Sequence, residues 1–279
     1  NGTSWSNEPD MNTARSENAG AGTSTNALSI GGTPSYPTAT AVVEQWNGSS
    51  WTEITDINTA RNDLGGLKGG GTITDALVFG GLNRSGPTTY ASTEFWDGSS
   101  WTELADLSTA RYGGSGSGTS SAALYAAGNT GSRVGISEEW SAPSDFNQIQ
   151  EGQLYFNSTA NAFKETITDV PGGTWASGTN LNTARDSSTG VGTATANLVS
   201  GGNSPSNNYY AIVEQWDGSS WTEKNDLNVG RRYAQGNGSS TSALFVGGVI
   251  PPGNTDVASN EQWDGSSWTE TGDLNTARR

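Results

Sequence analysis

A single motif, Trp-x4-Asp/Asn-x4-Arg, recurs six times and constrains the fold more than any other feature of the chain. The intervals between successive motif arginines are 46, 50, 74, 46 and 47 residues. A period of this length is typical of β-propeller blades or of helical HEAT-type repeats. Glycine contributes 39 of the 279 residues, and Ser, Thr and Asn are also frequent, which makes helices costly and favours strands. The copies run over Trp5–Arg15, Trp51–Arg61, Trp101–Arg111, Trp175–Arg185, Trp221–Arg231 and Trp268–Arg278.

Each period contains four segments that predict strands. The first is glycine-rich, as in residues 19–23, 65–72 and 113–119. The second is short and apolar, with a leucine in register in every copy, and the third ends in Glu-x-Trp. The fourth starts at the motif tryptophan, after an Asn-Gly or Asp-Gly pair that predicts a tight hairpin. The leucines are Leu28, Leu77, Leu124, Leu198 and Leu244, and the turns begin at Asn47, Asp97, Asp217 and Asp264.

The order of these segments resembles the kelch repeat of β-propellers. More narrowly, WDGSSWTELADLSTAR (96–111) and its sister copies resemble kelch-like repeats in tail-fibre and other virion-surface proteins of bacteriophages, marine and cyanophage-type ones especially. The resemblance covers nearly the whole chain. It implies an all-β, kelch-like β-propeller of four-stranded blades, located at a virion surface or outside the cell.

The phase of the repeats predicts one propeller over residues 1–279 with six sectors. In addition to five full repeats, the chain contains an extra outer strand at 3–9 and an inserted hairpin at 151–170. One arrangement combines that hairpin with the strand at Trp175 into a reduced sixth blade. Another places a boundary between two propeller segments at 141–150. The expected blade units are 16–56, 62–106, 112–180, 186–226 and 232–273.

Composition excludes several kinds of chemistry. The chain has no Cys and no His, so it has no disulfide, no thiolate or imidazole metal site and no Ser-His-Asp triad. The net charge of -15 argues against a nucleic-acid partner. No apolar run approaches the length of a membrane span, which argues against membrane insertion. Loop oxygens could in principle hold calcium, but no EF-hand-like spacing is present, so no metal and no cofactor are predicted.

Residues that recur in every blade indicate structure rather than a single catalytic site. A buried glutamate needs a cationic partner, so we predict ion pairs between the repeated glutamates and the motif arginines. The tryptophans that flank each hairpin are expected to pack between blades. A cationic ring of arginines and sugar-stacking tryptophans are the alternative, functional readings. The glutamates are Glu44, Glu94, Glu138, Glu214 and Glu261; the arginines are Arg15, Arg61, Arg111, Arg185, Arg231 and Arg278; the motif tryptophans are Trp5, Trp51, Trp101, Trp175, Trp221 and Trp268.

The connections between the second and third strands differ from one copy to the next, whereas the other turns are nearly constant. Variable loops on a rigid scaffold are where recognition usually resides. Tyrosine and asparagine supply adaptable stacking and hydrogen bonding. The alternative is that these are solvated loops free to drift. The candidate ligand-binding residues are Tyr36, Arg84, Tyr90, Arg133, Asn207, Asn208, Tyr209 and Tyr210.

The resulting hypothesis is a non-enzymatic recognition module, resembling a phage tail-fibre propeller that contacts a host-surface glycan or protein. The first alternative is a glycan hydrolase of depolymerase or sialidase type. The Asp-Gly turns of this chain, however, depart from the sialidase Asp-box, in which one residue separates Asp and Gly. The second alternative is a structural fibre or assembly propeller that binds other virion proteins.

Overall fold

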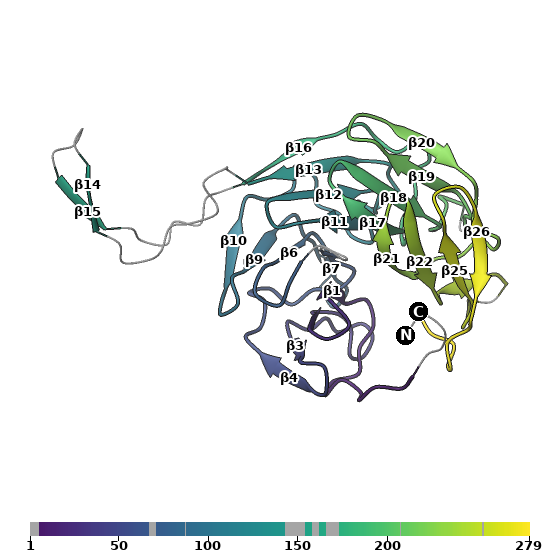
Figure 1. Cartoon of the computed structure of the whole chain (residues 1–279), viewed down its shortest axis with the longest axis horizontal. Helices are drawn as coiled ribbons and strands as arrows, with labels where there is room; N and C mark the ends of the chain where they lie inside the picture. Colours follow the sequence, from purple (N-terminus) through teal and green to yellow (C-terminus); the bar gives the residue numbers. More distant parts are fainter. Residues whose placement is uncertain are drawn as a thin grey trace.

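The computed structural model describes residues 6–66, 71–86, 88–142, 154–157, 162–165, 173–206, 208–252 and 254–279, and these contain strands and turns but no helix. Accordingly, no helix in this part of the chain could cross a membrane. Five four-stranded antiparallel sheets stand as blades around a common axis (Figure 1). The predicted all-β propeller of four-stranded blades is therefore confirmed.

Each blade follows the predicted order, with a glycine-rich inner strand and a tryptophan-led outer strand. The first blade contains β1 (Ala19–Gly22), β2 (Ala27–Ile30), β3 (Val43–Trp46) and β4 (Trp51–Ile54). The second contains β5 (Gly65–Gly66), β6 (Ala76–Phe79), β9 (Thr93–Trp96) and β10 (Trp101–Leu104). The third contains β11 (Ser115–Gly118), β12 (Ala122–Ala126), β13 (Ser137–Ser141) and β16 (Thr174–Ser177). The fourth contains β17 (Thr189–Thr193), β18 (Ala196–Ser200), β19 (Val213–Trp216) and β20 (Trp221–Lys224). The fifth contains β21 (Gln235–Ser239), β22 (Ser242–Val246), β25 (Asn260–Trp263) and β26 (Trp268–Thr271).

Three short hairpins lie outside these sheets. They are β7 (Leu82–Asn83) with β8 (Thr88–Thr89), β14 (Leu154–Asn157) with β15 (Ala162–Glu165), and β23 (Val249–Ile250) with β24 (Thr255–Asp256).

The inner strands contact one another in the order β1, β5, β11, β17, β21. Glycine makes this close approach possible. A Cβ atom on Gly116 would lie 2.7 Å from the carbonyl oxygen of Gly66 in the neighbouring blade, closer than a real Cβ contact allows. The glycine-rich segments therefore form the crowded centre of the ring, as the sequence predicts.

The strand that begins near Trp175 belongs to the third blade. β13 pairs with β16 in the register Trp140↔Trp175, which matches Trp46↔Trp51 in the first blade. The idea that this strand joins the inserted hairpin in a reduced sixth blade is therefore wrong, because β16 is the outer strand of the third blade and β14 and β15 form a separate two-stranded sheet. The two-segment alternative at 141–150 lies mostly outside the described residues, and β13 and β16 on its two sides pair in one sheet.

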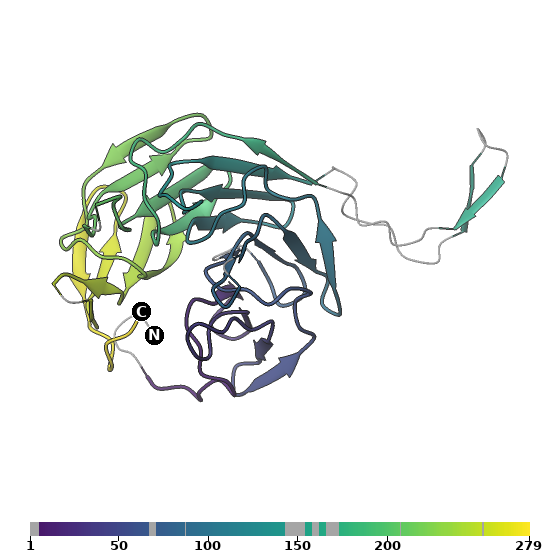
Figure 2. The ribbon, with the colours of Figure 1, turned by 180° about the vertical axis from the view of Figure 1, so that it is seen from behind.

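The ring is open between its first and fifth blades, as views from both sides show (Figures 1 and 2). The inner strand β21 of the fifth blade is largely exposed, whereas β11 of the third blade is fully buried. Residues 6–9 of the expected outer strand 3–9 form no strand, and residues 1–5 lie outside those described. The carbonyl oxygen of Pro9 nevertheless accepts a hydrogen bond of 3.2 Å from Trp51 Nε1. For the second blade the carbonyl oxygen of Thr55 accepts the equivalent hydrogen bond from Trp101 Nε1, so Pro9 has the same role for the first blade.

Buried ion pairs join successive sectors, as predicted. The arginine that ends one motif reaches the glutamate on the third strand of the next blade. Arg111 bonds Glu138 with both side chains fully buried. The other four pairs are Arg15–Glu44 at 2.7 Å, Arg61–Glu94 at 2.8 Å, Arg185–Glu214 at 2.7 Å and Arg231–Glu261 at 2.6 Å.

The tryptophans pack across each outer hairpin, with ring centres 5.1–5.7 Å apart. Their indole nitrogens are also satisfied. Trp216 Nε1 donates to Ala194 within its own blade, and Trp221 Nε1 donates to Thr179 in the connection from the preceding blade. These tryptophans therefore stabilise the seams, the contacts between neighbouring blades, through ring packing and through the hydrogen bonds of their N–H groups.

Candidate functional site

The variable loops gather at one end of the propeller axis, hereafter the axial face. Each connection from a fourth strand to the next first strand forms a bridge with the connection between strands two and three of the following blade. Examples are Asn62↔Leu82, Tyr112↔Asn129 and Asp186↔Asn203. These two sets of loops therefore lie on one face.

A belt of backbone hydrogen bonds runs around the axis beneath these loops. It is made by the residue two positions after each of the first five motif arginines. Asp63 donates to Glu17 (3.0 Å), Gly113 to Asp63 (2.9 Å), Ser187 to Gly113 (2.7 Å) and Tyr233 to Ser187 (3.0 Å). Among the described residues, no such bond leads from Tyr233 back to Glu17, so the belt is open where the ring is open.

All five belt residues have left-handed backbone conformations, with φ between 49° and 64°. Four of them are not glycine, although this region is costly for residues with a side chain. Strain of this kind persists only where the surrounding structure enforces it, and it is concentrated at functional sites. Here the inter-blade hydrogen bonds enforce it.

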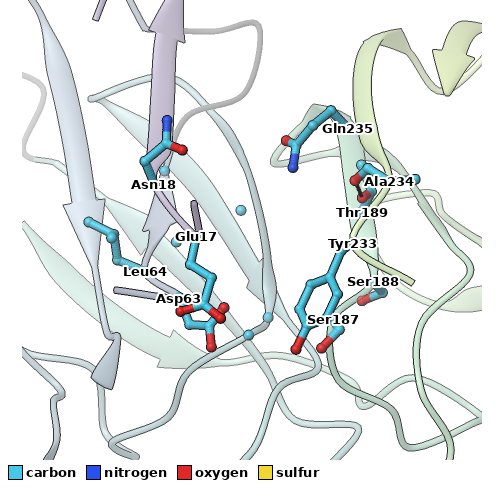
Figure 3. Close-up of a pocket in the computed structure, with 15 residues that line it drawn as sticks. Glu17, Asn18, Asp63, Leu64, Ser187, Ser188, Thr189, Tyr233, Ala234 and Gln235 are labelled. Atoms are coloured by element: carbon cyan, nitrogen blue, oxygen red, sulfur yellow. Dashed lines mark hydrogen bonds between the residues drawn. The ribbon is translucent and has the colours of Figure 1, made fainter. Parts of the chain in front are cut away.

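The belt side chains line a small axial cavity of about 60 Å³. Glu17 and Asp63 stand on one side of it, and Ser187 and Tyr233 stand on the other (Figure 3). Sequence reasoning missed these positions. The available signal was that the motif copies agree up to the arginine and diverge immediately after it.

Arg84, a candidate from the variable loops, turns inward and neutralises the acidic side of the cavity. Its Nη2 lies 3.1 Å from Glu17 Oε1 and also bonds Asp63 Oδ2. Burial of the carboxyl group, together with the nearby Glu17, raises the pKa of Asp63 to about 7, although Arg84 opposes this shift. This carboxyl group therefore titrates close to neutral pH.

Arg133, a second candidate, is also engaged with a carboxylate. Its Nε lies 3.0 Å from Asp186 Oδ2, and the same oxygen accepts a 3.0 Å hydrogen bond from Asn129 Nδ2. The loop arginines Arg84 and Arg133 thus hold the axial face together instead of projecting into solvent.

A larger cavity of about 360 Å³ lies in the opening between the first and fifth blades. One wall comes from the start of the first blade and the other from the start of the fifth. The lining residues are Ser16, Glu17, Asn18, Gly20, Arg232, Tyr233, Gln235 and Arg279.

Tyr209 connects the variable loops to this opening. Its hydroxyl group bonds Asn254 Oδ1, and its ring lies 4.7 Å from the guanidinium carbon of Arg232. Arg232 Nη2 donates to the same Asn254 oxygen at 2.9 Å. Loops of the fourth and fifth blades are therefore joined by one polar and aromatic cluster.

The remaining candidate residues are more dispersed. Tyr36 is 78% exposed. Tyr90 and Tyr210 are half-buried, and their carbonyl groups accept hydrogen bonds from Arg111 and Arg231. Asn208 is exposed, with its backbone N–H bonded to Ser204 Oγ at 2.8 Å, and Asn207 lies outside the described residues.

The axial face offers hydrogen bonding, stacking and ion pairing. Within the described residues, no three carboxylates are grouped as a metal ion would require. The side chains of this face supply polar, aromatic and cationic groups.

No family model matches this sequence, and no curated protein matches it. Among solved structures, 175 chains match its fold. One of them, the structure of YjhT, aligns with a TM-score of 0.68 and 12% sequence identity. The alignment covers 92% of this chain and 84% of that chain. At this identity the likeness concerns the fold alone, and it supports a β-propeller, a fold consistent with a binding module.

Proposed function

We propose that this chain is a non-enzymatic recognition module that binds a surface glycan through its axial face. One observation carries the proposal. The blades repeat the same strands, tryptophans and ion pairs, whereas the belt residues and the adjoining loops differ from copy to copy on a single face. A rigid scaffold with one variable face is the usual arrangement of a binding protein.

The chemistry of that face supports a sugar ligand. Tyr209, Arg232 and Asn254 form a fixed group of aromatic and hydrogen-bonding side chains beside the larger cavity. Flat aromatic rings contact the apolar faces of sugars, and amide and guanidinium groups bond their hydroxyls. The resemblance of the repeated motif to virion-surface repeats suggests the setting: a host-surface glycan, met at a virion surface or outside the cell. A host-surface protein is the other partner that such a face could bind.

A glycan array followed by a cell-binding assay tests this function. Tyr209→Ala should weaken binding by roughly tenfold or more if the ring belongs to the binding surface. Thr241→Ala is the matched control, because Thr241 lies in the β21–β22 turn at the opposite end of the blade. Equal binding by wild type and Tyr209→Ala, or no binding to any glycan or cell surface, would refute the proposal.

A glycan hydrolase is the second candidate, favoured by the raised pKa of Asp63 beside Glu17. A carboxylic acid that stays protonated near neutral pH is suited to general acid catalysis. Arg84 bonds both carboxylates, however, and competes with any substrate for them. Turnover of a polysaccharide by the wild type, abolished in Asp63→Asn, would establish this activity in place of simple binding.

A further inference from the structure

We propose that the cavity in the opening of the ring binds an anionic sugar residue, with Arg232 as its principal contact. This inference rests on the proposed function and names the class of glycan. It is argued from charge, from the fixed position of Arg232 and from the size of the cavity.

The charge argument concerns four arginines on the axial face. Arg84 and Arg133 are neutralised by carboxylates. Arg279 lies 3.8 Å from Asp256, and both of these side chains are largely exposed. Within the described residues, Arg232 is bonded to Asn254 and stacked on tyrosines but is paired with no carboxylate. Arg232, Arg279 and Glu17 line one cavity; Glu17 is paired with Arg84 and Arg279 lies near Asp256, so Arg232 is the cation of this cavity that has no carboxylate partner among the described residues.

Arg232 is held in place before any ligand arrives. Its guanidinium carbon lies 4.7 Å from the ring centre of Tyr209 and 4.9 Å from that of Tyr233. A guanidinium group held in this way loses little entropy on binding, and its fork of N–H groups matches a carboxylate or sulfate group.

The cavity has the size and lining for one sugar unit. Its volume of about 360 Å³ lies at the lower end of the range for small-molecule sites. The wall opposite Arg232 carries Ser16, Asn18 and Glu17, whose carboxylate is paired with Arg84, and Gln235 lies on the same side as Arg232. These side chains supply donors and acceptors for hydroxyl groups around a central acidic group.

The cavity lies where the first and fifth blades face each other across the opening. Elsewhere the inner strands of successive blades are in contact. At the position of Arg232 in other sectors, Asn62 donates to Thr33 and Asp186 is bonded by Arg133. Arg232 is therefore the cation at this position, and within the described residues it lines the cavity without a carboxylate partner.

Calorimetric titration of the whole chain tests this proposal with three probes: an oligogalacturonate, which carries carboxylates, a sulfated oligosaccharide and a neutral dextran oligosaccharide. We expect binding of at least one acidic probe, weakening as salt is raised, and no comparable binding of the neutral one. Arg232→Gln should lower the affinity for the acidic probe by roughly tenfold or more. Lys224→Gln, on the outer strand β20, removes the same charge away from the cavity and should leave affinity unchanged.

Gln235→Trp provides a second variant that fills the cavity without altering charge, and it too should weaken binding of the acidic probe. Thermal melts establish that each variant is folded. If neutral glycans bind and acidic ones do not, or if Arg232→Gln and Lys224→Gln behave alike, this inference is wrong and the proposed function stands. If no glycan of any kind binds, both fail.

Discussion

Arg61 Nη2 lies 2.8 Å from Glu94 Oε1, and this buried ion pair links the end of the first blade to the third strand of the second. Burial lowers the pKa of the Arg61 guanidinium, while the Glu94 charge acts in the opposite direction. Glu94 Oε2 also accepts a 2.7 Å hydrogen bond from the backbone of Asn58, so one carboxylate holds the whole connecting loop. The sixth motif arginine, Arg278, is exposed at the opening.

The first prediction compares Arg61, which is buried and paired, with Arg278, which is exposed. Arg61→Ala leaves Glu94 buried without its cation and should lower the free energy of unfolding by about 3–5 kcal/mol. Arg278→Ala removes the same side chain from an exposed site and should change it by less than about 0.5 kcal/mol. Urea unfolding followed by tryptophan fluorescence measures both. Similar losses in the two variants would show that the ion pairs do not join the blades.

Asp63 makes stability depend on pH. Its pKa in the folded chain, about 7, lies above the ordinary value of 3.8. Between these values the folded state binds more protons than the unfolded state, so stability should fall as pH rises from 4 to 7 and then level off. The contribution is at most roughly 4 kcal/mol. Unfolding free energies across this range should show a shallower decline in Asp63→Asn, and an unchanged slope would contradict the assignment.

Substitution of Trp221 measures how much the seams between blades contribute to stability. Trp221 is buried, its ring centre lies 5.3 Å from that of Trp216, and its Nε1 donates to Thr179. Trp221→Phe removes this donor and part of the packed surface, and should cost about 1–3 kcal/mol. Trp51→Phe is the control, because Trp51 is half-buried at the opening. Chemical denaturation should show the smaller loss in Trp51→Phe; the reverse order would argue against the seam as a main source of stability.

Substitution of Gly192 measures how strictly the inner hairpins require glycine at the turn. The φ of Gly192 is 116°, and a Cβ atom would lie 2.2 Å from the carbonyl oxygen of Ala196. Gly192→Ala should therefore lower stability by about 2 kcal/mol or more. Gly86→Ala, at a site with no atom within 4 Å of the added Cβ, should be nearly neutral. Differential scanning calorimetry compares the two melting temperatures, and equal values would show that the turn can relax.

Much of the blade could be predicted because its contacts recur. Glu44, Trp46 and Arg15 have counterparts in every blade, so a single physical argument applied to all copies at once. The belt could not be predicted in this way. The left-handed conformations of Glu17 and Tyr233 oppose local preference and arise from hydrogen bonds to residues in neighbouring blades. Arg84 likewise turns inward because Glu17, 67 residues away, lies beside it.

The sequence by itself determined the unit of this protein: four strands, tight Asp-Gly or Asn-Gly turns, paired tryptophans and a buried glutamate that pairs with a motif arginine. These features depend on contacts within a repeat or between adjacent repeats, and the residues that make them recur in each copy of the sequence. Tertiary structure decided how the five blades are placed relative to one another. The distance between the first and fifth blades depends on how the four packings between successive blades add up around the axis, and no local pattern encodes that sum. The opening, its cavity and the unpaired charge of Arg232 follow from it.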